Sequence, residues 1–490
     1  MAVYLPTWES VGSHPLPDWY DDAKLGIFVH WGLYSVPGWA PQVPDIQQLL
    51  REQGPAELLR NNPYAEWYLN SSRLVGSPTW YHQRDTYGPD ATYDDFVIPF
   101  DDGTAGADMD AIAAVCRDAG AGYVVLTTKH HDGFCLWPSN LTHPHKGRYH
   151  ARRDIVGDLR RAVLDAGLRM GLYYSGGYDW PYNDALLKNP ADSFLAVPRT
   201  GDYVRYATGH VRELVSRYRP SVLWNDICWP AGGDLPTLFA EYYNAVPDGV
   251  INDRWVEPPQ HRGAVGDAVA RAGGVVVQRF WSLIPERYKS LTFPAEHHYD
   301  IRTPEYAQFA TVQRTKWEST RGVGHSFGAN RNERPEDIVT ATELIRSFAD
   351  IVSKNGNLLI GIGPDRFGRI PEEQLVPLRG LGSWLGDNGT AVFGTRPWAI
   401  AEATTTEGGA VRFTQRDGAV YAILLDVSAP DFGIREVDAT AVTEVGLLGI
   451  PEQVQWRVED GRLRVRLPER LPVSPAHVLN LGHGLRPAAA

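Results

Sequence analysis

The feature that most limits the fold is a repeated alternation of short apolar runs with amphipathic stretches. Six runs have the length and apolar content of buried strands: Lys24–Trp31, Tyr123–Thr128, Arg169–Ser175, Ser221–Asp226, Val250–Arg254 and Asn357–Gly361. Between them, apolar residues recur at helical spacing over Met109–Ala119, Ile155–Ala166, Tyr203–Tyr218, Leu235–Ala245, Pro335–Ser353 and Glu372–Asp387. Because a helix that follows a strand returns the chain to a parallel strand, this order predicts an α/β fold. We expect a (β/α)8-type (TIM-like) barrel, with a doubly wound sheet as the second choice.

After about residue 390 the pattern changes to short alternating runs separated by turn signals such as Arg416-Asp417-Gly418 and Glu459-Asp460-Gly461. The runs predicted as strands are Thr395–Ile400, Ala410–Thr414, Ala419–Leu425, Glu444–Leu448, Val454–Val458 and Arg462–Leu467. This pattern is typical of a β-sandwich. We therefore expect a catalytic barrel over residues 1–390 and a C-terminal β-sandwich over residues 391–490.

Composition excludes several classes of protein. A net charge of −12, with no basic patch among aromatic residues, argues against a nucleic-acid partner. The three cysteines, Cys116, Cys135 and Cys228, are odd in number and unclustered, which indicates neither a disulfide framework nor a zinc motif. The N-terminus lacks a signal-peptide pattern, and no apolar run is long enough to span a bilayer. We expect a cytoplasmic protein without a membrane partner.

Polar residues follow five of the predicted strands. In a (β/α)8 barrel the reacting groups lie at the carboxyl ends of the strands. The residues at those ends are His30, Lys129–Asp132, Tyr173–Ser175, Asn225–Asp226 and Asn252–Arg254. A single Asp at a strand exit, such as Asp226, is often only a turn residue. The recurrence at five ends favours a common site.

Tryptophan is abundant near these clusters. Of 16 tryptophans, those beside polar clusters are Trp31, Trp39, Trp67, Trp137, Trp224, Trp229 and Trp255. A single Trp more often packs the core or its rim. Indole rings also stack on the C–H faces of sugar rings, so the clustering indicates a carbohydrate ligand.

Motifs for metal and cofactor chemistry are absent from the sequence. His130 and His131 are adjacent on a predicted strand, so their side chains face opposite sides and suit one metal ion poorly. No Gly-x-Ser-x-Gly elbow, phosphate-binding loop or dinucleotide fingerprint occurs. We expect no metal and no cofactor, which leaves hydrolysis by side chains alone.

Hydrolysis of a glycosidic bond needs two carboxyl groups. Asp226 is the first candidate. Asp253, beside Arg254, suits an ion pair better than a proton donor. From the residues alone, the second group stays open among Asp253, Glu257, Glu286, Glu296, Glu305 and Glu318.

A series of longer motifs resembles the α-L-fucosidases of glycoside hydrolase family 29 over about residues 8 to 390. They are Ala23–Gly32 with Tyr34–Trp39, Thr127–Phe134, Leu223–Asp226, Asn252–Trp255, Trp317-Glu318 through Ser326–Gly328 with Asn330–Glu333, and Asp350–Leu359. The predicted β-sandwich matches the architecture of that family.

The resemblance implies a retaining exo-α-L-fucosidase that acts by double displacement on a fucosylated oligosaccharide or glycoconjugate. It implies Asp226 as the nucleophile and Glu305, in Thr303-Pro304-Glu305-Tyr306, as the acid/base, with Glu318 as the runner-up. The sugar-binding roles it carries over fall on His30, Glu66, Trp67, His130, His131, Tyr173, Trp224, Arg254 and Phe327.

Two other functions stay in view: a retaining glycosidase for another L-sugar, such as an α-L-galactoside, and a non-enzymatic fucose-binding protein. A homo-oligomer is compatible with the sequence.

Residues 256–302 form a long insertion before Thr303, and its run Val275–Trp281 predicts an extra hairpin or a lid.

Overall fold

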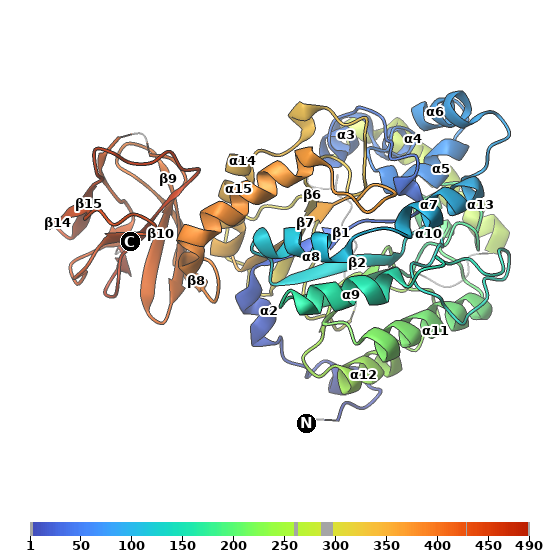
Figure 1. Cartoon of the computed structure of the whole chain (residues 1–490), viewed down its shortest axis with the longest axis horizontal. Helices are drawn as coiled ribbons and strands as arrows, with labels where there is room; N and C mark the ends of the chain where they lie inside the picture. Colours follow the sequence, from blue (N-terminus) through green and yellow to red (C-terminus); the bar gives the residue numbers. More distant parts are fainter. Residues whose placement is uncertain (1–2, 259–262, 286–296, 428, 489–490) are drawn as a thin grey trace.

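A curled sheet of parallel strands forms the centre of the larger domain (Figure 1). The computed structural model describes residues 3–258, 263–285, 297–427 and 429–488. Seven strands lie in the order β5-β4-β3-β2-β1-β7-β6. Their bounds are Leu25–Val29 (β1), Tyr123–Lys129 (β2), Arg169–Ser175 (β3), Val222–Asp226 (β4), Val250–Ile251 (β5), Trp317–Gly322 (β6) and Gly356–Ile362 (β7). Nearly every residue of these strands is buried, as expected when both faces of a parallel sheet are covered.

The two edge strands, β5 and β6, are joined by residues 300–306, which we call the closing segment. Ile301 bridges Asn252 beyond β5, and Arg302 and Glu305 bridge Trp317 and Thr320 of β6, all in parallel orientation. The amide of Asp300 donates to Ile251 O at 2.9 Å, and the amide of Tyr306 donates to Thr320 O at 2.9 Å. The closing segment acts as an irregular eighth strand, and the predicted barrel is confirmed. The predicted strands included neither β6 nor the closing segment.

Helices cover the outside of the barrel (Figure 1). Five of the predicted helices begin and end within two residues of the predicted positions: Met109–Asp118 (α8), Ile155–Asp165 (α9), Gly201–Tyr218 (α11), Leu235–Ala245 (α12) and Glu372–Asn388 (α15). The sixth helix, α14, covers Ala341–Ser353 and begins later than predicted. Thr340 caps it through a reciprocal capping box with Glu343, which leaves Pro335–Asp337 as a separate 3-10 turn.

Shorter helices precede β1 and fill the connection from β1 to β2. The chain begins with Trp8–Val11 (α1) and Asp18–Ala23 (α2). The β1–β2 connection contains Ile46–Gln53 (α3), Pro55–Arg60 (α4), Tyr68–Arg73 (α5), Pro78–Tyr87 (α6) and Val97–Thr104 (α7).

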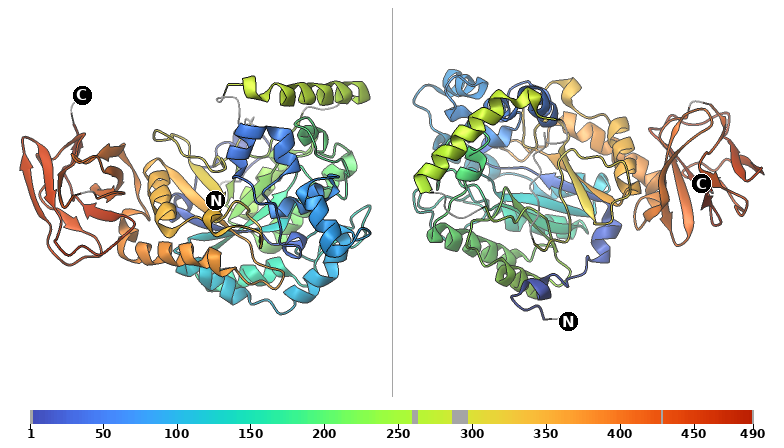
Figure 2. Two further views of the ribbon diagram at one scale, coloured as in Figure 1. Left: turned by 90° about the horizontal axis from the view of Figure 1, so that it is seen from above. Right: turned by 180° about the vertical axis from the view of Figure 1, so that it is seen from behind.

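The insertion contains a helix, α13 (Gly263–Arg279), so the predicted hairpin is wrong. The β-branched run Val275–Val277 favours a strand locally, but tertiary contacts stabilise a helix. Gln278 accepts a hydrogen bond from the amide of Ala56 in α4 at 2.8 Å, and the Trp281 indole donates to Leu50 O in α3 at 2.7 Å. Figure 2 shows α13 lying across the outside of the N-terminal helices. The rest of the insertion, residues 259–262 and 286–296, lies outside the described residues.

The C-terminal part forms antiparallel sheets around a separate core, which confirms the predicted β-sandwich. Helix α15 ends at Asn388, and the first strand, β8, begins at Arg396. One sheet contains β8 (Arg396–Thr404), β9 (Ala410–Arg416), β10 (Ala419–Leu424), β13 (Gly446–Leu447) and β16 (His477–Asn480). A second contains β11 (Asp431–Gly433), β14 (Gln455–Glu459) and β15 (Arg462–Arg466), and β12 (Val437–Asp438) pairs with β17 (Arg486–Pro487).

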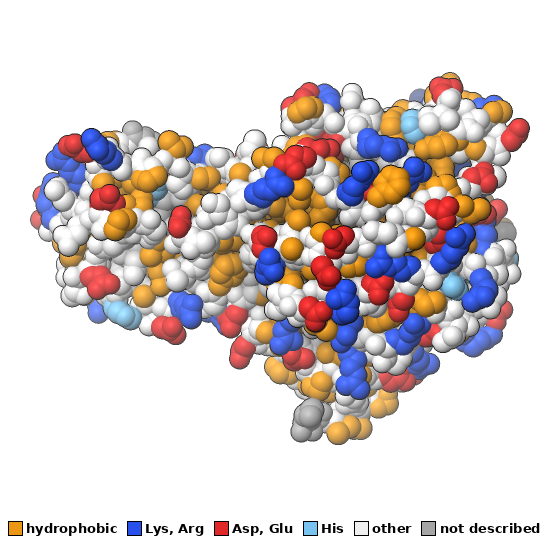
Figure 3. All heavy atoms as spheres, viewed as in Figure 1, with side chains coloured by type: hydrophobic (Ala, Val, Ile, Leu, Met, Phe, Trp, Pro, Cys, Tyr) orange, Lys and Arg blue, Asp and Glu red, His pale blue; other side chains and the backbone are white. Residues whose placement is uncertain are grey.

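Charged side chains join the two domains. Asp350 of α14 lies between Lys354, at 2.8 Å, and Arg412 of β9. On the face shown in Figure 3, acidic and basic side chains are interspersed over both domains. Within the described ranges, no helix combines the length and the apolar content needed to cross a membrane.

Candidate active site

A cavity of about 1190 Å³ opens at the carboxyl ends of the strands. It is lined by every residue to which the sequence assigned a catalytic or sugar-binding role: His30, Glu66, Trp67, His130, His131, Tyr173, Trp224, Asp226, Arg254, Glu305 and Phe327. The barrel therefore brings together side chains that are spread over almost three hundred residues of sequence. Among the described residues, no group of His, Cys, Asp and Glu side chains has the arrangement of a metal site.

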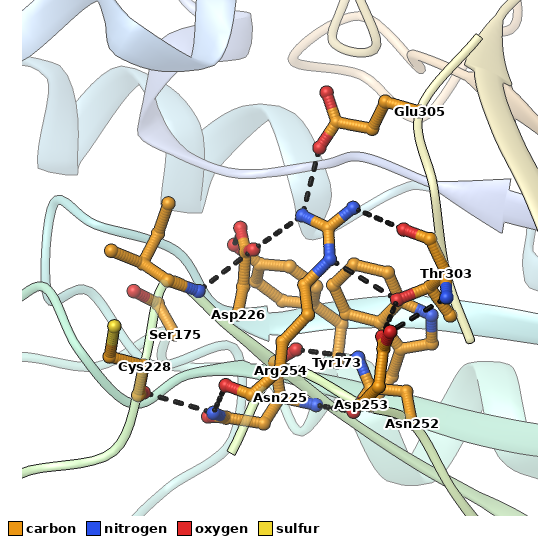
Figure 4. A network of polar contacts seen from close by, with 12 residues as sticks. Tyr173, Ser175, Asn225, Asp226, Cys228, Asn252, Asp253, Arg254, Thr303 and Glu305 are labelled. Atoms are coloured by element: carbon orange, nitrogen blue, oxygen red, sulfur yellow. Dashed lines mark hydrogen bonds and ion pairs between the residues drawn. The ribbon is translucent and has the colours of Figure 1, made fainter. Parts of the chain in front are cut away.

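Asp226 is the last residue of β4, and its carboxylate is held from three sides (Figure 4). Tyr173 OH donates to Oδ2 at 2.8 Å, whereas Arg254 Nη1 and the amide of Ile227 donate to Oδ1 at 2.8 and 2.9 Å. The backbone after Asp226 has an uncommon conformation, with positive φ angles of 69° at Ile227, which donates this hydrogen bond, and 137° at Cys228. The side chain of Asp226 is 11% exposed, so it faces the cavity while its orientation stays fixed.

Glu305 reaches the same cavity from the closing segment. Its Oε1 accepts from Arg254 Nη1 at 2.8 Å, and its Oε2 accepts from Tyr64 OH at 3.1 Å. Because Asp226 Oδ1 and Glu305 Oε1 contact one nitrogen atom, their separation is at most twice 2.8 Å. Retaining glycosidases need about 5 to 5.5 Å between the two carboxyl groups, and inverting ones need about 6.5 to 9.5 Å. The upper limit lies below the inverting range and is compatible with the retaining arrangement.

Thr303 fixes the guanidinium of Arg254. Arg254 Nε donates to Thr303 Oγ1 at 3.2 Å, and Nη2 donates to Thr303 O at 2.8 Å. Thr303 in turn donates its amide and its hydroxyl to Asp253 Oδ1 at 3.0 and 2.8 Å. Asp253 thus anchors the closing segment. Of the other carboxylates considered, Glu286 and Glu296 lie outside the described residues.

His131 is held as one tautomer. Ser175 Oγ donates to Tyr178 O at 2.9 Å, so its 2.7 Å contact with His131 Nδ1 requires Nδ1 to carry the proton. His131 Nε2 therefore presents a lone pair to the cavity, 3.9 Å from Asp226 Oδ2. Burial lowers the pKa of His131, and Lys129 and Arg254 lower it further. A neutral imidazole with this tautomer can accept a hydrogen bond from a hydroxyl group in the cavity.

His30 and His130 are neutral for the same reason, because burial lowers the pKa of each well below its usual value. Glu66 is also buried; it accepts from the amide of Gly328 at 2.9 Å and from Ser326 Oγ at 3.2 Å. Burial raises the pKa of Glu66 to about 7. These residues supply hydrogen-bonding groups without a fixed charge, which suits an uncharged ligand rich in hydroxyls.

Aromatic rings form the other walls. Trp67 meets His131 edge to face at 5.4 Å between ring centroids, and Phe327 packs against His30 at 4.9 Å. Trp224 stacks on Tyr173 at 5.4 Å. Polar groups thus face aromatic surfaces across the cavity, an arrangement typical of sugar sites.

Glu318 lies apart from the cavity. It is fully buried, and it is not one of the described residues that line the cavity. Its carboxylate accepts hydrogen bonds from Tyr20 OH at 2.6 Å, from Tyr123 OH and from Trp224 Nε1 at 3.2 Å. A carboxylate enclosed by three donors has no path to a leaving group in the cavity.

Sequence reasoning missed two residues that hold Glu305 and Arg254 in place. Tyr64 contacts Glu305, and Thr303 holds Arg254. Tyr64 stands two positions before Glu66, in a segment that the family resemblance had already marked. The closeness of Tyr64 to Glu66 in the sequence was the signal that could have pointed to Tyr64.

Comparison with known proteins agrees with this geometry. A family model described as "Alpha-L-fucosidase" matches residues 1–390. The chain belongs to the α-L-fucosidase family. The predicted family is confirmed, and with it the prediction of a glycoside hydrolase; the comparisons do not favour the alternative functions.

Relatives within the α-L-fucosidase family match most of the chain. It is 32% identical to the α-L-fucosidase of Dictyostelium discoideum over 91% of this chain and 86% of that one. It is 30% identical to the tissue α-L-fucosidase of Homo sapiens over 96% of this chain and 89% of that one. The crystal structure of Thermotoga maritima α-fucosidase in complex with fucose matches with 38% identity and a TM-score of 0.80, over 98% of this chain and 100% of that one.

Proposed function

We propose that this α-L-fucosidase uses Asp226 as the nucleophile and Glu305 as the general acid and base. The observation that supports the assignment is the shared contact with Arg254 Nη1, because it limits the distance between Asp226 Oδ1 and Glu305 Oε1 to twice 2.8 Å, below the range for inverting enzymes. Asp226 stands on the fixed side of the cavity, with three donors to its oxygens. Glu305 is the more exposed of the two, at 24% of its side chain, as a group that exchanges protons with a leaving group and with water should be.

In the first step, an Asp226 oxygen attacks C1 of the fucosyl unit, and protonated Glu305 gives its proton to the departing oxygen. The products are a fucosyl ester of Asp226 and a free alcohol. In the second step, ionised Glu305 takes a proton from water, and the resulting oxygen attacks C1 and releases Asp226. Both inversions occur at C1, so fucose leaves with its original anomeric configuration.

Arg254 links the two steps electrostatically. Before the attack, the guanidinium donates hydrogen bonds to both carboxyl groups. Once Asp226 is an ester, its negative charge is gone. Arg254 then stabilises the carboxylate of Glu305 alone, which is the state needed to activate water.

The other residues that line the cavity supply contacts for the sugar. His30, His130, His131 and Glu66 offer hydrogen-bond partners for the ring hydroxyls. Trp67, Tyr173, Trp224 and Phe327 offer aromatic surface for the C–H face and the methyl group of fucose. We propose a fucosylated oligosaccharide or glycoconjugate as the substrate, in line with the fucose complex of the Thermotoga neighbour.

Azide tests the two roles separately. With an activated aryl α-L-fucoside, Glu305→Ala in azide should yield α-L-fucosyl azide, because azide attacks the ester of Asp226. Asp226→Gly should instead yield β-L-fucosyl azide by one direct displacement. Glu318→Ala is the control and should gain nothing from azide. Rescue of Glu318→Ala, without rescue of Glu305→Ala, would overturn the assignment.

A further inference from the structure

Glu318 has an unusual place for a carboxylate. It lies on β6 and contacts two members of the buried cluster inside the barrel, Tyr123 and Trp224. Its exposed fraction is 0%. A carboxylate taken out of water to this depth is costly unless strong partners compensate.

The partners of Glu318 fit an ionised carboxylate. Oε2 accepts from the hydroxyls of Tyr20 and Tyr123, and Oε1 accepts from the indole N–H of Trp224. An indole N–H can only donate, so Oε1 must act as an acceptor. Burial raises the pKa of Glu318, while these three hydrogen bonds and the charge of Arg254 oppose that shift.

Trp224 connects this buried charge to the active site. Residues two apart on a strand share a face, so Trp224 lies on the same side of β4 as Asp226. The Arg254 guanidinium carbon lies 4.6 Å from the centre of the Trp224 ring, and the Tyr173 ring stacks on it with an angle of 24° between the planes. One edge of the indole is thus bound to the buried carboxyl group of Glu318 while its face carries a cation.

Both groups that rest on Trp224 hold the reacting carboxylates. Tyr173 OH donates to Asp226, and Arg254 Nη1 donates to Asp226 and Glu305. Hydrogen bonding of the indole to a carboxylate fixes the plane of the ring and increases its electron density, which strengthens its attraction for the guanidinium. A rotation of the indole would displace Tyr173 and Arg254 together.

We propose that Glu318 is a positioning residue for hydrolysis: through the N–H of Trp224 it sets the indole plane on which Tyr173 and Arg254 align Asp226 and Glu305. Glu318 touches neither the substrate nor the reacting atoms. The inference rests on the proposed roles of Asp226 and Glu305.

The first test is Glu318→Gln, which keeps the size of the side chain and removes its charge. We expect kcat to fall roughly 10- to 100-fold, because small misplacements of reacting groups have effects of that order, while KM changes little. The loss should be the same for aryl fucosides with good and poor leaving groups, and azide should not restore it. Tyr20→Phe is the matched control: it removes a donor to Oε2, keeps the contact with Trp224, and should leave kcat close to that of the unmodified enzyme.

The second test does not depend on the folding of a Glu318 variant. Replacing Trp224 with β-(3-benzothienyl)alanine keeps the bicyclic ring and removes the N–H. This substitution should reduce kcat at least as much as Glu318→Gln does, and adding Glu318→Gln to it should cost little more, because residue 318 then has no indole N–H through which to act.

Three results would overturn the inference: unchanged kcat in both single variants, losses that multiply in the double variant, or an equal loss in Tyr20→Phe. The measurement uses kcat per folded enzyme, so a purely structural role of Glu318 would lower the melting temperature without the kcat loss. Failure of the proposed function is seen elsewhere, in the azide products of the Asp226 and Glu305 variants.

Discussion

Asp226 and Glu305 accept hydrogen bonds from the same nitrogen atom, Nη1 of Arg254, each at 2.8 Å. One cation therefore sets both the separation of the two carboxylates and the electrostatic balance between them. The remaining nitrogens of this guanidinium are occupied by Thr303. The pair depends on a planar fork with several donors, which a lysine cannot reproduce.

Arg254→Gln should lower kcat on aryl α-L-fucosides by about 10²- to 10³-fold, the range for loss of one preorganised charged donor. Arg254→Lys should restore only part of this loss, because one ammonium cannot contact Asp226, Glu305 and Thr303 in the same geometry. Steady-state kinetics with both variants checks the prediction. A change confined to KM would show that Arg254 binds substrate without organising the carboxylates.

Ser175→Ala should allow the proton of the neutral His131 ring to move between Nδ1 and Nε2. Without the hydroxyl, Nδ1 loses its acceptor, and Nε2 no longer presents a lone pair at all times. We expect affinity for fucose to weaken about 2- to 10-fold, the equivalent of one hydrogen bond, and Ser175→Thr to retain it. Nitrogen-15 NMR of the histidine rings gives a direct check, since a proton on Nε2 of His131 in the unmodified protein would contradict the tautomer assignment.

Cys228→Gly should stabilise the fold relative to Cys228→Ala. With φ at 137°, Cys228 has a conformation that suits glycine, and such strain costs about 1 to 3 kcal/mol. Both variants lose the thiol, but only glycine removes the β-carbon. Chemical denaturation should therefore show a higher free energy of unfolding for Cys228→Gly, the reverse of the usual order of alanine and glycine. Equal stabilities would mean that this backbone is not strained.

Glu66 should make stability depend on pH. Its pKa is raised from 4.5 to about 7 by burial, so the folded state binds a proton more strongly than the unfolded state does. The free energy of unfolding should consequently fall as pH rises from 4.5 to 7, with a contribution on the order of 3 kcal/mol from this group. Glu66→Gln removes the contribution, and the difference between the two unfolding curves should vary over this range. A constant difference would contradict the shifted pKa.

The strands that could be predicted are those buried on both faces. Arg169–Ser175 was predicted with its bounds because a parallel strand inside a barrel is a continuous apolar run. Strand β6 was missed because Trp317–Gly322 contains Glu318 and Arg321, whose polarity is explained only by partners elsewhere in the chain. Pro304 lacks the amide hydrogen of a regular strand residue and hid the closing segment in the same way.

For the site, strand-end position predicted Asp226, His30 and His131, since the fold gathers those ends at one mouth. The contact of Tyr64 with Glu305 spans 241 positions of sequence, and it depends on how a helical connection folds over the barrel. No local pattern encodes such a pairing. The family resemblance implied Glu305 as the second carboxylate, whereas the carboxylates alone left several candidates.

The closing segment makes Asp226 and Glu305 unequal in how firmly the sheet holds them. Asp226 ends a strand that has neighbours on both sides, so relocating it would mean rebuilding the sheet. Glu305 belongs to the closing segment, which is attached to the neighbouring strands through isolated bridges. A change in the length or sequence of the chain that leads into the closing segment can therefore move Glu305 while the sheet keeps Asp226 in place.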